Sequence, residues 1–195
     1  MGTHEYHQAS RGRLITEGLT FDAEKHEYYY NGKSLSGVTG LISKKQKKNF
    51  ATGHVEEGRS QGSHVHAAIE EYITLGTVSS VHPDARWAIE EIKGFEQDGY
   101  KIFSEVLVSD FNKYASAIDI FAIDHDAIYL FDTKAGNFDR AYVTWQLSIY
   151  KYFLETQTKY RVDRLFCMST KHHDFYPIIP KGTDEVEGLL YGRTL

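Results

Sequence analysis

The sequence predicts one α/β domain of 195 residues, with a central mixed β-sheet flanked by helices. Three consecutive strand patterns, at 101–109, 113–123 and 127–134, precede a helix pattern at 142–156 and strand patterns at 162–170 and 175–179. This order of strands, helix and further strands is typical of a layered α/β fold. A hydrophobic content of 41% is sufficient for one compact core. The 14% of aromatic residues, beside only 3 prolines, argues against a disordered chain.

The N-terminal part of the chain begins with a segment that has no clear periodicity. We expect residues 1–20 to be a flexible or accessory segment, frayed over the first dozen residues. Residues 21–33 are predicted to form a β-hairpin, because Asn31-Gly32 is typical of a type I′ turn and aromatic residues precede it. A short helix at 40–42 then leads into a run of lysines.

Helical periodicity is clearest in the segment 51–75. Its apolar residues recur at i, i+3, i+4, i+7 and i+8, which gives one apolar face, formed by Val65, Ala68, Ile69, Tyr72 and Ile73. A second helix is predicted at 83–97, because a proline there suits the first helical turn. The long helix at 142–156 has its own apolar stripe, and a last short helix is expected at 183–190.

Cysteine content and charge limit the function classes. The one cysteine, Cys167, excludes an internal disulfide framework, a cysteine-ligated zinc site and an iron–sulfur cluster. No signal peptide or membrane-spanning stretch is apparent, so we expect a reducing, cytoplasmic setting without membrane partners. The net charge of −5 does not favour nucleic-acid binding. It does not exclude a local basic surface or a metal site either, because a metal site gathers carboxylates and makes the total charge more negative.

Two strands joined by a polar turn carry the candidate chemistry. Asp132 and Lys134 are two residues apart on one strand, so their side chains project from the same face of the sheet. Asp119 on the preceding strand joins them if the two strands pair as a hairpin. Two carboxylates and an ammonium group would then form a Mg²⁺ site with a lysine beside it. The alternatives are an exposed Asp132–Lys134 ion pair of little energetic value and an Asp119 that caps backbone groups.

Four motifs, in this order, resemble the PD-(D/E)XK nuclease superfamily. They are the stretches at 34–43 and 62–70, then Asp119 followed by Asp132-Thr133-Lys134, and last the stretch at 146–155. The RecB-like branch is the most similar, with its stand-alone phage and mitochondrial nucleases. The resemblance implies a restriction-endonuclease-like core. The family usually has glycine two residues before the first aspartate, where this chain has Ala117.

The resemblance also implies a ligand set. Mg²⁺ or Mn²⁺ would be held by His66, Asp119, Asp132 and the backbone carbonyl of Thr133. Lys134 would orient the attacking water or stabilise charge that develops on the phosphate. The spacing from Gly62 favours His66 over its neighbour His64 as the ligand. The alternative is that His66 is a half-buried histidine of the helix without a metal-binding role.

Further residues join the site in the same resemblance. Glu105, on the first strand of the meander, is either another metal ligand or a carboxylate without a site role; we expect it to share a strand face with Phe103 and Leu107. Glu70 either hydrogen-bonds His66 or lies on the surface. Gln146 and Tyr150 match a motif beside the active site and the substrate strand, with helix packing as the alternative.

The lysine run offers a candidate DNA contact. Lysines at four positions would grip phosphates, and an aromatic neighbour would stack on bases; these residues are Lys44, Lys45, Lys47, Lys48 and Phe50. The alternative is a solvated loop. The stretch His172-His173-Asp174 looks metal-like but is expected to be a turn.

From these residues and the resemblance we expect a metal-dependent deoxyribonuclease. An exonuclease that acts on DNA ends or single strands in phage or bacterial recombination and repair is favoured, with a helicase or recombination protein as partner. A structure-specific endonuclease or nickase remains an alternative, as does a non-catalytic DNA-binding protein that retains the fold. Strand polarity, DNA versus RNA, and the number of metal ions also stay open.

Overall fold

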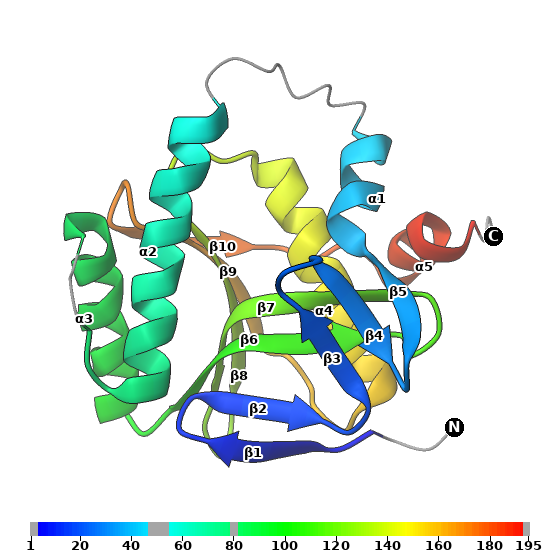
Figure 1. The fold of residues 1–195 in the computed structure, drawn as a ribbon, viewed down its shortest axis with the longest axis horizontal. Coiled ribbons are helices and arrows are strands. Elements are labelled where there is room, and N and C mark those ends of the chain that lie inside the picture. Colours follow the sequence, from blue (N-terminus) through cyan, green and yellow to red (C-terminus); the bar gives the residue numbers. More distant parts are fainter. Residues whose placement is uncertain (1–3, 47–54, 79–81, 193–195) are drawn as a thin grey trace.

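The computed structural model describes residues 4–46, 55–78 and 82–192, with the backbone alone for 55–63. Figure 1 shows helices on both sides of a strongly bent sheet. Within the described residues the helices are α1 (Val38–Lys45), α2 (Val55–Leu75), α3 (Pro83–Gln97), α4 (Arg140–Gln157) and α5 (Thr183–Tyr191). Among them none is long and apolar enough to cross a membrane.

One sheet of eight strands forms the centre of the molecule, in the order β10-β9-β8-β7-β5-β4-β3, with β6 also paired to β7. Its strands are β3 (Leu19–Asp22), β4 (Glu27–Tyr30), β5 (Lys33–Gly37), β6 (Lys101–Ser109), β7 (Tyr114–Ile123), β8 (Ile128–Lys134), β9 (Arg164–Ser169) and β10 (Asp174–Ile178). The β8–β9 and β5–β7 pairs are parallel and the others antiparallel. The predicted α/β class with a mixed sheet flanked by helices is therefore confirmed.

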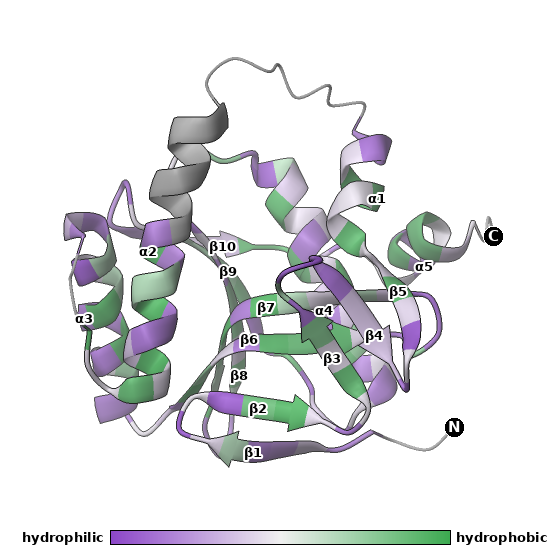
Figure 2. Cartoon of the chain, viewed as in Figure 1, coloured by the Kyte–Doolittle hydropathy of each residue, from purple (hydrophilic) through white to green (hydrophobic). Residues whose placement is uncertain are grey.

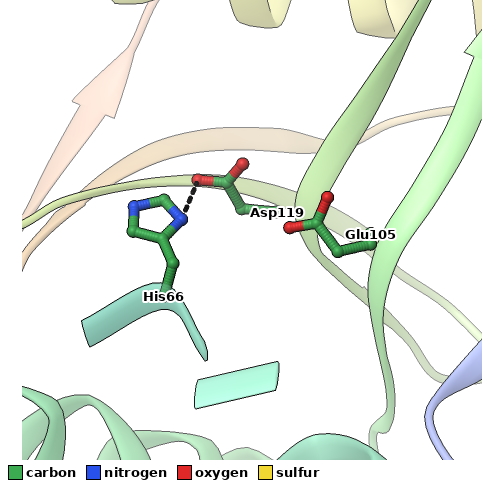
Figure 3. Close-up of side chains that lie close together, drawn as sticks. All are labelled: His66, Glu105 and Asp119. Atoms are coloured by element: carbon green, nitrogen blue, oxygen red, sulfur yellow. Dashed lines mark ion pairs between the residues drawn. The ribbon is translucent and has the colours of Figure 1, made fainter. Parts of the chain in front are cut away.

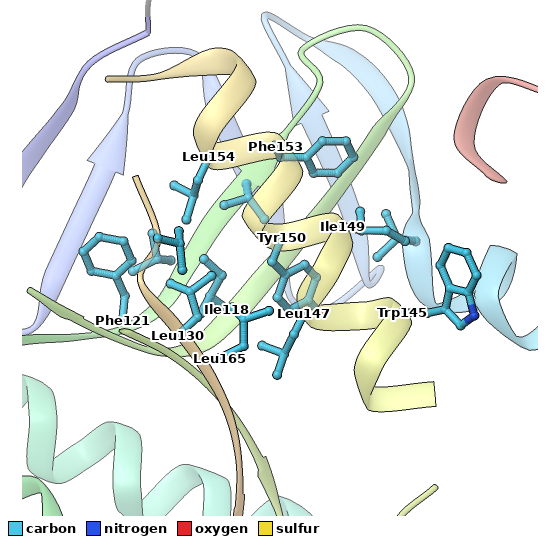
Figure 4. Close-up of a cluster of buried hydrophobic side chains, with 14 of the residues drawn as sticks. Ile118, Phe121, Leu130, Trp145, Leu147, Ile149, Tyr150, Phe153, Leu154 and Leu165 are labelled. Carbon is cyan, nitrogen blue, oxygen red and sulfur yellow. The ribbon is translucent and has the colours of Figure 1, made fainter. Parts of the chain in front are cut away.

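Hydrophobic cores lie on both faces of this sheet. On one face α4 packs Leu147, Tyr150, Phe153 and Leu154 against the strands, and α1 and α5 add to the same core (Figure 4). On the other face α2 and α3 cover a second core, and the predicted apolar face of α2 is buried there. Figure 2 shows hydrophobic residues along β6 and β7, which lie between the two helix layers. Strands buried on both faces hold polar side chains in fixed positions.

The edge of β7 that faces β8 is shared by two partners. β8 pairs with its last four residues, Ile120 to Ile123, and β5 pairs with Tyr114 and Ala115 at its start. Within the described part of the chain, no strand pairs with residues 116–119 on that edge. Asp119 therefore lies at the point where two neighbouring strands diverge, which leaves space for side chains from α2 and α4.

The N-terminal residues are more ordered than we expected. Residues 6–16 form a hairpin of β1 (Tyr6–Ser10) and β2 (Arg13–Thr16), so the prediction of a frayed start is wrong there. Tertiary contacts supply the order that the polar sequence does not indicate. The hydroxyl of Tyr6 donates to the carbonyl of Leu107 at 2.6 Å, and Leu14 is buried in the core.

Most element boundaries agree with expectation within a few residues. The Asn31-Gly32 turn joins β4 and β5 as predicted, and an additional strand, β3, extends the hairpin to three strands. Helix α1 begins at Val38 instead of 40, so it is longer than expected and includes two of the lysines. Helix α4 begins at Arg140, because the side chain of Asp139 caps it by accepting from two backbone N–H groups. His172-His173 lies in the turn before β10, as expected.

Candidate metal centre

Three carboxylates form a row across three adjacent strands. In the β6–β7 ladder the residues on either side of Glu105 pair with those on either side of Asp119, so the two face each other. The β7–β8 ladder ends at Ile120 and Phe131, and the next residues along are Asp119 and Asp132. Glu105, Asp119 and Asp132 are therefore neighbours across β6, β7 and β8.

The strands break their regular alternation at this row. Phe103 and Val106 both pack in the core beside α4, although three residues apart they would face opposite sides of a regular strand. Glu105 between them has a φ of +50°, in the left-handed region. On β7, Ile118 and Phe121 likewise share the α4 side. The expectation that Glu105 shares a face with Phe103 is wrong, because this break turns the carboxylate towards α2.

Helix α2 brings an imidazole to these carboxylates. The Nδ1 atom of His66 lies 3.7 Å from Oδ2 of Asp119, and one ligand atom each from His66, Glu105 and Asp119 lie within 4.8 Å of one another (Figure 3). His64 is exposed, so the structure brings His66 to the strands, in line with the motif spacing. Among the described residues this compact group includes Glu105 and does not include Asp132.

The backbone of Thr133 connects β8 to this cluster. Its N–H donates to Oδ2 of Asp119 at 2.7 Å, and its carbonyl oxygen lies 3.0 Å from Nε2 of His66. The carbonyl predicted as a ligand thus faces the predicted imidazole ligand. Because a carbonyl oxygen only accepts, this contact is a hydrogen bond that Nε2–H of His66 donates. It leaves Nδ1, which faces Asp119, as the nitrogen that could bind a metal.

Asp132 and Lys134 project from the same face of β8, as predicted. The side chain of Asp132 is 1% exposed, and Nζ of Lys134 lies 2.6 Å from its Oδ2. No other described residue donates a hydrogen bond to either oxygen of Asp132. A buried carboxylate with so few donors is costly unless a charge or a metal compensates it.

The pKa values follow from this crowding of charge. Burial raises the pKa of Asp132 to about 6, and the charge of Asp119 adds to the rise, against the opposing effects of Lys134 and His66. Burial also raises the pKa of Glu105 to about 8, with contributions from Asp119 and Glu70. For Lys134 burial acts to lower the pKa, but the attraction of Asp132 and Asp119 outweighs it, so the net shift is upward. Lys134 is thus a protonated cation at neutral pH.

Gln146 and Tyr150 lie beneath the carboxylates on α4. The amide nitrogen of Gln146 donates to the Tyr150 hydroxyl at 2.7 Å, and the Ser116 hydroxyl donates to it at 2.9 Å. Burial raises the pKa of Tyr150 well above its usual value, and the charges of Asp132 and Asp119 add to the effect. Both residues therefore pack in the helix and also lie beside the site.

Glu70 has a different partner from the one we expected. It forms an ion pair with Arg13 on β2, and both side chains are partly exposed. Among the described residues no hydrogen bond or ion pair joins Glu70 to His66, so the predicted hydrogen bond to the imidazole is not observed. Glu70 acts on the cluster through its charge, which contributes to the raised pKa of Glu105.

Two residues near the cluster were not predicted from the sequence. Arg13 opposes the rise in the pKa of Glu105 and reaches the site from the N-terminal hairpin. Tyr28 on β4 has its pKa raised to about 12 by burial, with smaller contributions from Glu105 and Asp119. Neither residue belongs to a motif, and only the tertiary fold brings them close. The Asn31-Gly32 turn and the aromatic residues before it predicted a hairpin here, but not which residues would lie next to Tyr28.

The basic run is only partly described. Lys44 and Lys45 are exposed in the last turn of α1, where cations suit the negative end of the helix dipole. The ammonium group of Lys45 lies 4.4 Å from the ring centroid of Trp145. Lys47, Lys48 and Phe50 lie outside the described residues.

Comparison with known proteins adds no relative to this picture. The chain matches no protein-family model and shows no significant similarity to a curated protein. The case for a function therefore depends on the side chains of the candidate metal centre and on their geometry.

Proposed function

We propose that the protein is a metal-dependent deoxyribonuclease of the RecB-like PD-(D/E)XK type. It would hydrolyse phosphodiester bonds with an activated water, as an exonuclease on DNA ends or single strands. The single observation that supports this most strongly is the meeting of His66, Glu105 and Asp119 beside the buried Asp132–Lys134 pair. A structural ion pair would not require three further ionisable groups at the same place.

The residues present fit a Mg²⁺ or Mn²⁺ ion. Carboxylate and carbonyl oxygens with one imidazole nitrogen form a donor set that suits these ions better than structural zinc. Asp132 has two buried oxygens whose close polar partner among the described residues is the ammonium group of Lys134. Asp119, Glu105, His66 and the Thr133 carbonyl would complete the ligands. When bound, such an ion polarises a phosphoryl oxygen and lowers the pKa of its water.

Lys134 has the properties that the reaction needs beside those ligands. Its ammonium group is held by Asp132 at 2.6 Å and its side chain remains 28% exposed, so it can reach a substrate. A cation fixed in this way stabilises negative charge that develops on a phosphate, without reorganisation during the reaction. Gln146 and Tyr150 support the site from α4 through their hydrogen bond.

The experiment that tests this function compares substrates and metals. Purified protein is incubated with end-labelled linear and with circular DNA, single- and double-stranded, in Mg²⁺, Mn²⁺ or EDTA. We expect metal-dependent release of nucleotides from ends, with circles resistant. Cleavage of circles would indicate an endonuclease or nickase instead. Binding without cleavage under every condition would indicate a non-catalytic DNA-binding protein.

Variants locate the activity in this site. Lys134→Ala and Asp132→Asn should each lower the cleavage rate at least 100-fold, because they remove a positioned charge. Lys93→Ala and Asp126→Asn are matched controls, since the Lys93 side chain on α3 is 41% exposed, Asp126 is exposed in the turn before β8, and neither belongs to the cluster. Circular dichroism confirms that each variant is folded. Undiminished metal-dependent cleavage by folded Asp132→Asn would contradict the assignment.

A further inference from the structure

A cavity opens directly beside the candidate metal centre. Its volume is about 460 Å³, within the range of about 300–1,000 Å³ that is usual for small-molecule sites. Its lining residues come from the N-terminal strands β2 and β3 on one side and from α2 and β6 on the other. Glu105, a member of the metal cluster, forms part of its wall. A molecule in this cavity would therefore be adjacent to the metal ligands.

The walls of the cavity are mainly apolar. Leu14 and Leu19 are buried, Phe21 is partly exposed, and Ile15 keeps 51% of its surface exposed. Large aliphatic side chains that line an open cavity leave apolar surface in contact with water, which a bound apolar group would remove. The ring of Phe21 also packs against Tyr28, with 4.7 Å between the ring centroids. That contact holds the ring in place.

The charges in the walls argue against a phosphate group. Two carboxylates, Glu70 and Glu105, line the cavity beside one guanidinium, Arg13, which already forms an ion pair with Glu70. The cavity therefore offers an anion no cation that is not already paired among its lining residues. A flat, uncharged ring with polar edges suits the apolar walls and the aromatic ring, because every nucleobase has a face that stacks on aromatic side chains.

We propose that this cavity binds one nucleobase of the DNA strand whose phosphate lies at the metal centre. The inference rests on the proposed nuclease function and adds a subsite to it. The base would contact Phe21 and Ile15, while its own backbone leads past Glu105 to the ligand cluster. Binding of an unstacked base requires a single strand or a frayed end. The N-terminal hairpin thus takes part in substrate selection as well as in the fold.

Removal of the base from the substrate and removal of the side chains that line the cavity should lower kcat/KM by the same factor. Single-stranded oligonucleotides are prepared with one abasic nucleotide at successive positions around the scissile phosphate. We expect the wild-type kcat/KM to fall about tenfold for one such position and little for the others, because one stacked base is lost. Phe21→Ala and Ile15→Ser should lose about as much on the intact strand. On the oligonucleotide with the sensitive abasic position, the kcat/KM of both variants should equal that of the wild type. The base that these side chains would contact is then already absent, so their removal costs nothing more.

Ile179→Ser is the matched control. Ile179 is also an exposed isoleucine, with 85% of its surface accessible, and it does not line the cavity. Ile15→Ser guards against a folding defect in Phe21→Ala, because its side chain is already half exposed. If wild-type protein cleaves DNA but neither abasic positions nor the two variants change kcat/KM, the subsite is overturned and the nuclease function stands. If wild-type protein cleaves no strand with any metal, the nuclease proposal fails and the subsite fails with it.

Discussion

Glu105 shows how one residue can make the metal-free site unfavourable. Its carboxyl group lies in a partly buried position beside Asp119 and Glu70, and its pKa is raised to about 8. The folded state therefore holds a proton on Glu105 at a pH where the unfolded chain has released it. A bound divalent ion would replace that proton. The same crowding that weakens the fold at high pH thus favours a cation.

This gives a pH-dependent prediction. The pKa of Glu105 is higher in the folded state than in the unfolded chain. Its contribution to the free energy of unfolding is therefore fully present below about pH 4.5 and is lost as the pH rises through about 8. In EDTA the Tm of the wild type should therefore fall between pH 5 and 8.5, and that of Glu105→Gln should fall less. Mn²⁺ should raise the wild-type Tm most at pH 8 and raise that of the variant less. Thermal unfolding monitored by circular dichroism measures both effects, and parallel pH curves for the two proteins would contradict the prediction.

The sequence predicted the site only as far as local patterns reach. Asp119, Asp132, Lys134 and His66 follow from strand alternation and from motif spacing, and the structure brings them together. The direction of Glu105 could not be predicted, because it depends on a left-handed backbone conformation at a non-glycine residue. The pairing of Glu70 with Arg13 joins residues 57 positions apart, and no local pattern encodes it.

At the scale of elements, the turn of the N-terminal hairpin is fixed against α2. Gly12 has a φ of +64°, and a Cβ there would lie 2.4 Å from the carbonyl oxygen of Ile73. Gly32 has a φ of +79°, but a Cβ there would meet nothing within 4 Å. The two glycines have similar backbone conformations and differ in their surroundings.

This pair gives a matched test of how tightly the hairpin docks. Gly32→Ala should lower the free energy of unfolding by about 1 kcal/mol, because alanine disfavours positive φ. Gly12→Ala should lower it by about 3 kcal/mol, because the backbone contact with α2 must also shift. Urea unfolding followed by circular dichroism measures both values. Equal losses would mean that the hairpin yields easily and is not firmly docked.

The elements themselves were predicted with uneven success. The helix at 83–97 and the strands of the meander were confirmed, because their periodicity and length are clear. The hairpin of β1 and β2 was missed, since its strands are short and most residues of β1 are exposed and polar. Its order comes from contacts with α2 and β6, such as that of Tyr6 with Leu107. Tertiary contacts of this kind cannot be predicted from local sequence patterns.

At the scale of the whole molecule, charge must be considered by location. The chain has 27 acidic and 22 basic residues, and several of the acidic ones gather at the metal centre. The net charge would repel DNA, so attraction must come from a local basic surface. The lysine run begins in the last turn of α1 and precedes the helix that carries His66, and Lys44 and Lys45 are exposed. The run is therefore the candidate DNA-binding surface because of its position next to the helix that carries His66, even though the net charge of the protein is negative.

The salt dependence of DNA binding tests that role. In EDTA, where cleavage is prevented, single-stranded DNA should bind more weakly to the quadruple variant in which Lys44, Lys45, Lys47 and Lys48 are alanine. The slope of log K against log salt should flatten by up to about 3, because each lost phosphate contact on a single strand contributes about 0.7. The control is a second quadruple variant with the same net charge, in which four exposed lysines elsewhere are changed to alanine. These are Lys25, Lys101, Lys113 and Lys159. Fluorescence anisotropy at several salt concentrations measures both slopes. Equal slopes in the two variants would show that only the total charge matters and that the run is an ordinary solvated segment.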